Sequence, residues 1–357
     1  MSYKSRAFLR LDRVKVVTDA WWNKVPYIQP YYAIKSFPNT DLIKFLHAQN
    51  FKFDCASKGE IKLVARNLPG DQQIIFSNPV KSPADITYAR NKNVNLLVVD
   101  SVEEVEKIHK INKKAQFILR VTGHESNSVI RFNNKFGADS NKTAQILNYI
   151  GVNNLKFAGY SYHVGSQCHN MDSHRITINK IIDYIHFSNA LGLRTKLIDI
   201  GGGFENINQL AELNRIYNKY FRFTLERNNI ELIAEPGRLI AAPSLDIVVK
   251  VIAVSANGPN YKVTVNDSIY HSFQGAMYDS QKFKPILINH LQSPQNSESV
   301  HCVIFGQTCD SLDIICKTLM SLPKIGDYIM FSQMGAYSLA SAGGKFNGFE
   351  AAQLNPN

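Results

Sequence analysis

Short apolar segments alternate with longer amphipathic segments along the first two thirds of this 357-residue sequence. The apolar segments are rich in β-branched and aromatic residues, which favour strands, and the amphipathic segments have helical periodicity. Eight strands are predicted, at residues 31–35, 51–57, 73–79, 95–100, 117–121, 157–164, 197–200 and 232–235. Eight successive βα units predict an α/β fold with a TIM-like (β/α)8 barrel over residues 12–243.

Capping residues indicate where two of the helices begin. Asn39 or Thr40 precedes one amphipathic segment, and either side chain is suited to accept a hydrogen bond from the first turn. Ser101 and Glu104 have the spacing of a capping box, in which each side chain accepts from the backbone of the other residue. Both signals lie shortly after a predicted strand, as the βα alternation requires.

The pattern changes after Pro243, where β-branched and aromatic runs follow one another with almost no helical segment between them. These runs predict a separate antiparallel β domain. The early segment RAFLRL also has a strand pattern and precedes the barrel, so we assign it to the same domain. The predicted domains are therefore a barrel at 12–243 and a β-sheet domain at 1–11 plus 244–357.

Composition limits the partners that this chain is expected to have. Lys and Arg outnumber Asp and Glu by 40 to 29, but the lysines are interspersed with acids on helical segments such as 101–115. Such a distribution is typical of solvated helix faces, so we expect no nucleic-acid partner. No apolar run is long enough to cross a bilayer or to serve as a secretory signal, so we expect a cytoplasmic protein without a membrane partner. The five dispersed cysteines are expected to be reduced thiols.

Polar and glycine residues gather at the carboxyl ends of the predicted barrel strands. Lys35 ends the first strand and Arg120 the fifth, Gly201–Gly203 follow the seventh, and Glu235 and Arg238 follow the eighth. Active sites of such barrels lie at these strand ends, so the side chains are expected to meet. Each feature alone has a structural alternative, namely a lysine in water, a tight glycine turn, or an interior carboxylate paired with a nearby base.

Together these residues indicate a site for pyridoxal phosphate (PLP). The backbone N–H groups of Gly201–Gly203 can approach an anion closely, and the Arg238 guanidinium is suited to phosphate oxygens. Lys35 is suited to form a Schiff base with the cofactor, and Glu235 to keep its pyridine nitrogen protonated. The histidines and cysteines lack the spacing of metal ligands, so no metal is expected.

Longer motifs occur in the same chain, among them PYYAIKSFPN, FDCASKGEI, YHVGSQ, LIDIGGGF and AEPGR. Through them the chain resembles the fold type III PLP-dependent decarboxylases of basic amino acids, and within these the eukaryotic-type ornithine decarboxylases. The resemblance implies an alanine-racemase-like barrel followed by a β domain. The cofactor-binding residues that it implies are Lys35, Asp54, Arg120, His163, Ser166, Gly201, Gly202, Gly203, Glu235, Arg238 and Tyr337.

The β domain carries further motifs of this family, VNDSIYHSFQGAMYDS, GQTCDSLD and MGAYS. The resemblance implies that Tyr278, Asp279 and Asp310 bind the substrate and that Cys309 handles a proton. Without the motif, the thiol would be interpreted as an inert core residue and the acids as solvated loop residues. The catalytic residues implied in this way are Lys35, Cys309, His163 and Glu235.

The resemblance also implies a homodimer with two shared active sites. Cys309 and Asp310 of one subunit would enter the site built on Lys35 of the other subunit. Lys135 and Asp313 form the candidate ion pair across this interface.

The predicted function is decarboxylation of L-ornithine to putrescine and CO2, a step of polyamine biosynthesis. The alternatives are an arginine or lysine decarboxylase of the same fold, a non-catalytic regulator like the antizyme inhibitors, and a PLP racemase. Retention of Lys35, Asp54 and Cys309 disfavours the regulator, and the CDSLD segment disfavours the racemase. In the family that the chain resembles, a changed acid in this segment goes with use of arginine, so the resemblance implies that Asp279 favours ornithine over arginine.

Overall fold

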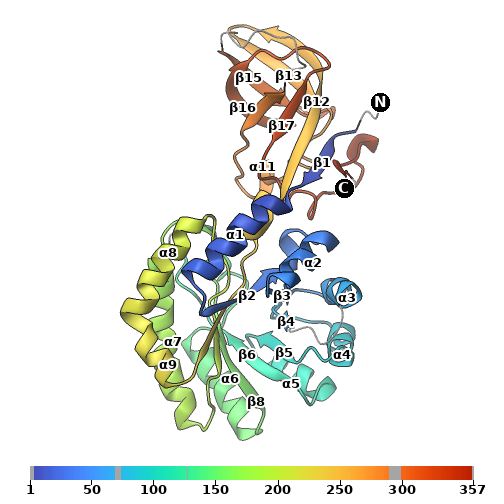
Figure 1. The fold of residues 1–357 in the computed structure, drawn as a ribbon. Coiled ribbons are helices and arrows are strands. Elements are labelled where there is room, and N and C mark those ends of the chain that lie inside the picture. The colour runs from blue at the N-terminus through green and yellow to red at the C-terminus, as the bar shows by residue number, and fades with distance from the viewer. Residues whose placement is uncertain (1–3, 69–73, 127, 289–298, 356–357) are drawn as a thin grey trace. The chain divides into compact units, whose positions relative to one another are not determined.

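A computed structural model describes residues 4–68, 74–126, 128–288 and 299–355 of the chain. The chain divides into two compact units, of which one comprises Lys15–Ile240 and the other combines Met1–Val14 with Ala241–Asn357. The first unit contains a closed barrel, and the second is built around a β-sheet (Figure 1). Among the described residues, every helix is too short or too polar to span a bilayer.

The first unit is a parallel barrel that closes on itself through eight strands within the described part of the chain. In spatial order the strands run β10-β11-β2-β3-β4-β5-β6-β8, and each pairs in parallel with its neighbours. Their bounds are β2 (Ile28–Ala33), β3 (Lys52–Cys55), β4 (Ile74–Phe76), β5 (Leu96–Val99), β6 (Gln116–Arg120), β8 (Lys156–Ser161), β10 (Leu197–Asp199) and β11 (Glu231–Ala234). The predicted α/β barrel is therefore confirmed.

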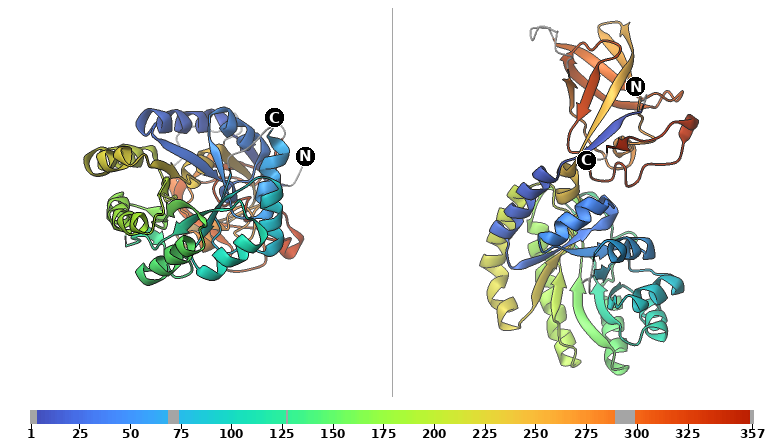
Figure 2. Two further views of the ribbon diagram at one scale, coloured as in Figure 1. Left: turned by 90° about the horizontal axis from the view of Figure 1, so that it is seen from below. Right: turned by 45° about the vertical axis from the view of Figure 1, so that its right-hand side comes forward.

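Helices follow the barrel strands and surround them, as Figure 2 shows. They include α2 (Thr40–Ala48), α3 (Lys58–Asn67), α4 (Pro83–Asn91), α5 (Val102–Ile111), α6 (Ser140–Val152), α7 (Asp172–Ala190), α8 (Ile207–Ile216), the π-helix η2 (Tyr217–Phe221) and α9 (Arg222–Arg227). Helix α1 (Leu11–Lys24) precedes the first barrel strand. A two-stranded ribbon of β7 (Ser128–Ile130) and β9 (Ser166–Cys168) lies outside the barrel sheet.

Side-chain caps begin several of these helices directly after the strands. Asn39 is the cap of α2, where its Oδ1 accepts from the backbone N–H of Leu42 at 2.9 Å. Ser101 caps α5 by accepting from the backbone N–H of Glu104. The carboxylate of Glu104 accepts from the backbone N–H of Lys81 at 3.1 Å, which differs from the reciprocal bond of the predicted capping box. Glu104 thus ties α5 to the loop after β4.

An apolar cluster fills the interior of the barrel. Seven of the barrel strands each contribute one of its buried residues, namely Tyr31, Ile75, Val98, Ile118, Ala158, Leu197 and Ile233. Residues from so many strands of a closed sheet meet only inside it. Burial of each of the larger side chains contributes on the order of 2 kcal/mol, so the cluster holds the strand ends in a fixed arrangement.

The second unit contains a mixed β-sheet with the strand order β14-β17-β12-β13-β15-β16, to which β1 and β18 are added. The bounds are β1 (Arg6–Leu9), β12 (Leu245–Asn257), β13 (Asn260–Val265), β14 (Pro285–Ile288), β15 (Ser299–Phe305), β16 (Ile314–Ser321), β17 (Tyr328–Phe331) and β18 (Gln353–Leu354). The pairs β13–β15 and β1–β18 are parallel, so the prediction of a wholly antiparallel domain was wrong in this detail. The long connection between β13 and β15 lets the second strand return in the same direction.

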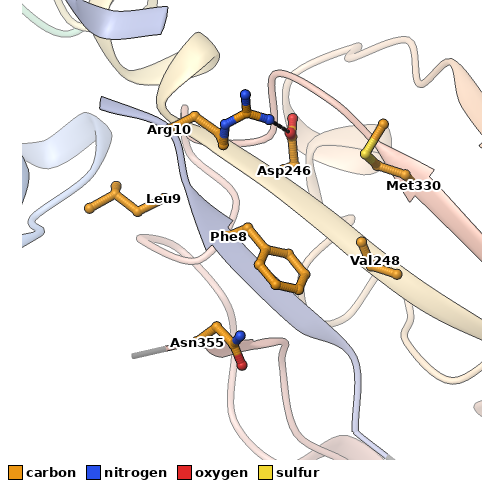
Figure 3. A pocket seen from close by; sticks show the side chains of 7 residues that line it. All are labelled: Phe8, Leu9, Arg10, Asp246, Val248, Met330 and Asn355. Atoms are coloured by element: carbon orange, nitrogen blue, oxygen red, sulfur yellow. Dashed lines mark hydrogen bonds and ion pairs between the residues drawn. The ribbon is translucent and has the colours of Figure 1, made fainter. Parts of the chain in front are cut away.

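A pocket of about 350 Å³ lies on the sheet of this unit (Figure 3). Its lining includes Phe8, Val248 and Met330 from three strands, together with the ion pair of Arg10 and Asp246. Asp246 also accepts from Arg13 at 2.7 Å, and Arg10 also donates to Asp12. The charges at this pocket are therefore paired with one another, and the remaining lining is largely apolar.

Candidate active site

Lys35 lies at the rim of the barrel, two residues beyond the end of β2. The predicted strand extended to Lys35, but β2 ends at Ala33 and a 3-10 turn covers Ile34–Ser36. The hydroxyl of Ser36 donates to the Ala33 carbonyl at 2.7 Å, which stabilises the turn. The Lys35 Nζ donates to Oδ2 of Asp54 at 3.2 Å, while the lysine side chain remains 41% exposed. The amine is thus oriented by a buried acid and still accessible.

Three carboxyl groups lie together at the same end of the barrel. Asp54 is on β3, Asp199 ends β10, and Glu235 follows β11. Burial raises the pKa of Asp199 well above its usual value, and the neighbouring Glu235 raises it further. Burial raises the pKa of Glu235 to about 7, and the charge of Asp54 adds to this effect. Because the two buried carboxyl groups of Asp199 and Glu235 disfavour each other's charged form, this pair is suited to share a proton near neutral pH.

His163 presents a neutral ring beside these groups. Removal from water lowers its pKa well below the usual value, and the positive charges of Arg120 and Lys35 lower it further. The His163 Nδ1 accepts from the backbone N–H of Gly165 at 3.0 Å. The rings of His163 and Phe132 pack edge to face, with their centroids 4.8 Å apart. Such a ring is oriented on both sides and is suited to stack on a flat ligand.

The glycine loop Gly201–Gly203 lies directly against the His163 segment. Gly201 has φ +65° and Gly203 has φ +101°, in the left-handed region that favours glycine. A Cβ on Gly201 would lie 2.4 Å from the Tyr162 carbonyl oxygen, and one on Gly202 would lie 3.1 Å from Nε2 of His163. Only glycine therefore allows the loop to approach this closely.

Arg238 and Ser166 approach each other close to Gly203, which faces the Gly165 carbonyl. The Arg238 Nη2 is 3.5 Å from the Ser166 hydroxyl, although the two residues are far apart in the sequence. Arg238 begins the short helix α10 (Arg238–Ala241), and Ser166 begins β9. A guanidinium, a hydroxyl and glycine backbone of this kind are suited to bind a phosphate group.

Substitution of Gly201 by alanine should destabilise the protein far more than the same substitution at Gly192. Both glycines have positive φ, but a Cβ on Gly192 meets nothing within 4 Å, whereas one on Gly201 meets the backbone of Tyr162. Gly192→Ala should cost about 1 kcal/mol for the backbone conformation alone. Gly201→Ala should cost at least about 3 kcal/mol because the clash is added. Urea unfolding of both variants measures the difference, and equal losses would contradict the close approach.

The candidate residues of the β-sheet unit form a second group. Asp279 is buried, Tyr278 is exposed, and Tyr337 is half-buried in the loop after β17. Cys309 lies exposed on the loop between β15 and β16, where its backbone N–H donates to Asn347 at 3.1 Å. Asp310 accepts a hydrogen bond from the hydroxyl of Tyr270. The unit thus presents a thiol and acids on defined loops.

The two residues of the predicted interface pair have different surroundings. The carboxylate of Asp313 is buried and accepts from the backbone N–H groups of Ile269 and Thr308 and from the Thr308 hydroxyl. The Lys135 ammonium lies 5.0 Å from the centre of the Phe136 ring. Asp313 therefore organises the loop that carries Cys309, and its pairing with Lys135 stays a prediction.

Sequence reasoning missed a buried lysine close to this end of the barrel. Lys81 is buried after β4, where its ammonium donates to the Val98 carbonyl and lies 5.2 Å from the centre of the Phe76 ring. Burial lowers the pKa of Lys81 to about 7. No sequence signal separates Lys81 from the many exposed lysines, because the pattern around it is that of a loop.

The residues present fit PLP. Lys35 offers an amine, Asp199 and Glu235 can hold a proton, and the glycine loop with Arg238 offers a phosphate site on the same rim. Two buried oxygens, Oδ1 of Asp54 and Oδ2 of Asp199, have no hydrogen-bond donor within the described residues. Within the described part of the chain, no three His, Cys, Asp or Glu side chains are arranged so that they could hold a metal ion.

Comparison with known proteins agrees with this geometry. Residues 11–242 match the family described as the pyridoxal-dependent decarboxylase, pyridoxal binding domain. The chain is 33% identical over 351 residues to a probable ornithine decarboxylase of Dictyostelium discoideum, covering 92% of this chain and 74% of that protein. It is also 31% identical to antizyme inhibitor 2 of Xenopus laevis, covering 93% of this chain and 76% of that protein. The chain therefore belongs to the pyridoxal-dependent decarboxylase family, and its cofactor is PLP.

Solved structures share both parts of the fold. The arginine decarboxylase of Paramecium bursaria Chlorella virus superposes with a TM-score of 0.93 at 27% identity, covering 99% of this chain and 95% of that chain. The lysine/ornithine decarboxylase of Vibrio vulnificus, solved with cadaverine, has a TM-score of 0.87 at 29% identity, covering 98% of this chain and 94% of that chain. Proteins of this fold thus differ in the basic amino acid that they decarboxylate.

Proposed function

We propose that this protein decarboxylates L-ornithine to putrescine and CO2 in the cytoplasm, as a step of polyamine biosynthesis. The observation that carries the proposal is the rim of the barrel, where Lys35, Glu235 and the loop of Gly201–Gly203 lie together. The curated relatives named ornithine decarboxylases, from Dictyostelium to mouse, support ornithine as the substrate.

Each residue of the rim has a proposed part in the reaction. PLP, when bound, would delocalise the electron pair that stays on the α-carbon when CO2 leaves. The Lys35 amine would hold the cofactor covalently, and Asp54 orients that amine through the 3.2 Å hydrogen bond. Glu235, whose pKa is raised by burial, would hold a proton at the ring nitrogen. Arg120, Ser166 and Arg238 contribute hydrogen-bond donors and positive charge around the same site.

The β-sheet unit is proposed to provide the substrate contacts and a proton. Asp279 and Asp310, with Tyr278, would bind the distal ammonium of the diamino acid. A short carboxylate that faces a buried ammonium stabilises one chain length best, which favours ornithine over lysine. The Cys309 thiol would return a proton to the carbon that has lost CO2. Tyr337 would contact the phosphate.

We propose that these two groups of residues meet in a two-fold homodimer. Each active site would then combine Lys35 of one subunit with Cys309 and Asp310 of the other. The exposed position of Cys309 on its loop supports this arrangement. Lys135 and Asp313 remain the candidate interface pair.

The substrate is tested by offering ornithine, lysine and arginine separately to the purified protein with PLP, with CO2 and amine products measured. Ornithine should have the highest kcat/KM. Asp279→Asn should lower kcat/KM for ornithine by about a hundredfold, because the distal ammonium loses its charged partner. Asp327→Asn, an exchange on a different loop of the same unit, serves as the matched control and should change little. A higher kcat/KM for arginine would refute the choice of substrate.

A non-catalytic regulator is the second candidate, because the chain is similar to an antizyme inhibitor as well. The presence of Lys35, Asp54 and Cys309 supports the enzyme instead. The same assay separates the two, since a regulator would release no CO2 from any of the amino acids even when PLP is bound.

A further inference from the structure

A buried tyrosine and a buried histidine form a hydrogen bond behind the glycine loop. The Tyr162 hydroxyl and Nδ1 of His174 are 2.9 Å apart, and both side chains are at most 1% exposed. Tyr162 follows strand β8 and directly precedes His163, whereas His174 lies in the first turn of α7. The hydrogen bond therefore joins a helix outside the barrel to the chain segment that carries a site residue.

Both residues also contact the glycine loop. On one side, the Tyr162 backbone packs against Gly201, because a Cβ on Gly201 would lie 2.4 Å from the Tyr162 carbonyl oxygen. On the other side, the His174 ring is stacked on the ring of Phe204. The two centroids are 5.6 Å apart, and the angle between the ring planes is 3°. Phe204 directly follows Gly203. The loop is thus held at its first glycine by Tyr162 and at its end by His174.

Burial of the His174 ring costs more free energy than burial of an apolar side chain would cost at the same position. Burial lowers the pKa of His174 to about 3, so its ring is neutral. Its Nε2 has no hydrogen-bond partner within the described residues, which costs free energy that a phenylalanine would avoid. The polar pair would be retained if its hydrogen bond fixes a geometry that apolar packing alone does not fix.

We propose that Tyr162 and His174 are positioning residues that hold the glycine loop in register with His163 and thereby set the affinity for the phosphate of PLP. The inference rests on the proposed use of the loop as a phosphate site. It does not depend on which amino acid is decarboxylated. Neither residue is required to touch the reacting atoms.

The test measures binding of PLP and of pyridoxal, which lacks the phosphate, to the cofactor-free protein. Tyr162→Phe and His174→Phe should each weaken PLP binding about tenfold, because a buried polar group loses its partner beside the loop. Pyridoxal binding should change less than about threefold, since the loop serves the phosphate. In the double variant the losses should be clearly less than additive, because both substitutions remove the same hydrogen bond.

Tyr160→Phe provides the matched control. Tyr160 lies on β8, two residues before Tyr162, and its hydroxyl donates to the Tyr184 carbonyl at 2.8 Å, so the control removes a comparable hydrogen bond from a different place. It should not change the ratio of PLP to pyridoxal affinity. His174→Gln, which retains a hydrogen-bonding group, replaces His174→Phe if that variant does not fold.

Three results would overturn the proposal. They are equal losses for PLP and pyridoxal, a Tyr160→Phe effect as large as that of Tyr162→Phe, and unchanged PLP binding by a folded Tyr162→Phe variant. Because no amino acid is added, a failure to decarboxylate ornithine would refute the proposed function and leave this inference standing.

Discussion

Replacement of Lys35 by alanine should lower kcat for the preferred amino acid by at least about a thousandfold, because in the proposed mechanism the ε-amine holds the cofactor covalently. The fold should remain intact. The turn that carries Lys35 is stabilised by the hydrogen bond between Ser36 and Ala33, and the ion pair with Asp54 is half exposed on the lysine side. Because the substitution leaves the buried Asp54 carboxylate without this partner, the variant should be less stable than the native protein but still folded.

Two measurements make the Lys35 prediction specific. Lys58→Ala, on an exposed residue at the start of α3, should keep nearly full activity. After borohydride reduction of the native protein with PLP, mass mapping should find the cofactor on the peptide that contains Lys35. A reduced adduct on Lys58 or Lys135 would show that the assignment of the cofactor lysine is wrong.

Mixing two inactive variants should restore activity if the active sites are shared between subunits. Lys35→Ala and Cys309→Ala homodimers should each be nearly inactive. In a mixed dimer, one site carries both substitutions and the other carries neither. Random pairing makes about half of the dimers mixed, with one intact site of two, so about a quarter of the native activity should return.

Subunit exchange has to be verified in the same mixture by differently tagged chains. Size-exclusion chromatography of the unmixed variants checks that each is still a dimer. If exchange is complete and the mixture stays as inactive as its parents, Cys309 does not act across an interface. The thiol would then need a different role.

The barrel could be predicted from the sequence because its strands are buried on both sides. Such strands appear as continuous apolar runs, and the run predicted at 95–100 is the observed β5 (Leu96–Val99). The run predicted at 157–164 was too long. The chain leaves the ladder after Ser161, yet Tyr162 and Val164 remain buried, so the apolar pattern continues past the strand.

Part of the site could also be predicted, since residues that follow parallel strands must meet at one end of a barrel. This rule brings Lys35, Glu235 and the glycine loop together. It does not predict which buried side chains support these residues from the protein interior. The partners Tyr162 and His174 belong to a strand end and a helix, and neither residue has a pattern that distinguishes it from ordinary core. The direction of the two parallel strand pairs in the β-sheet also depends on connections that local patterns do not specify.

The β-sheet of the second unit has a consequence for how the chain folds during synthesis. Strand β1 ends at Leu9, but its antiparallel partner β12 begins only at Leu245. At typical rates of translation, β1 has to wait roughly 10 to 50 seconds for that partner, while the contiguous barrel emerges first. During this interval the strand has unpaired backbone groups that invite association with other nascent chains. Expression at low temperature or with abundant chaperones should therefore improve the yield of this protein more than it would for an isolated barrel.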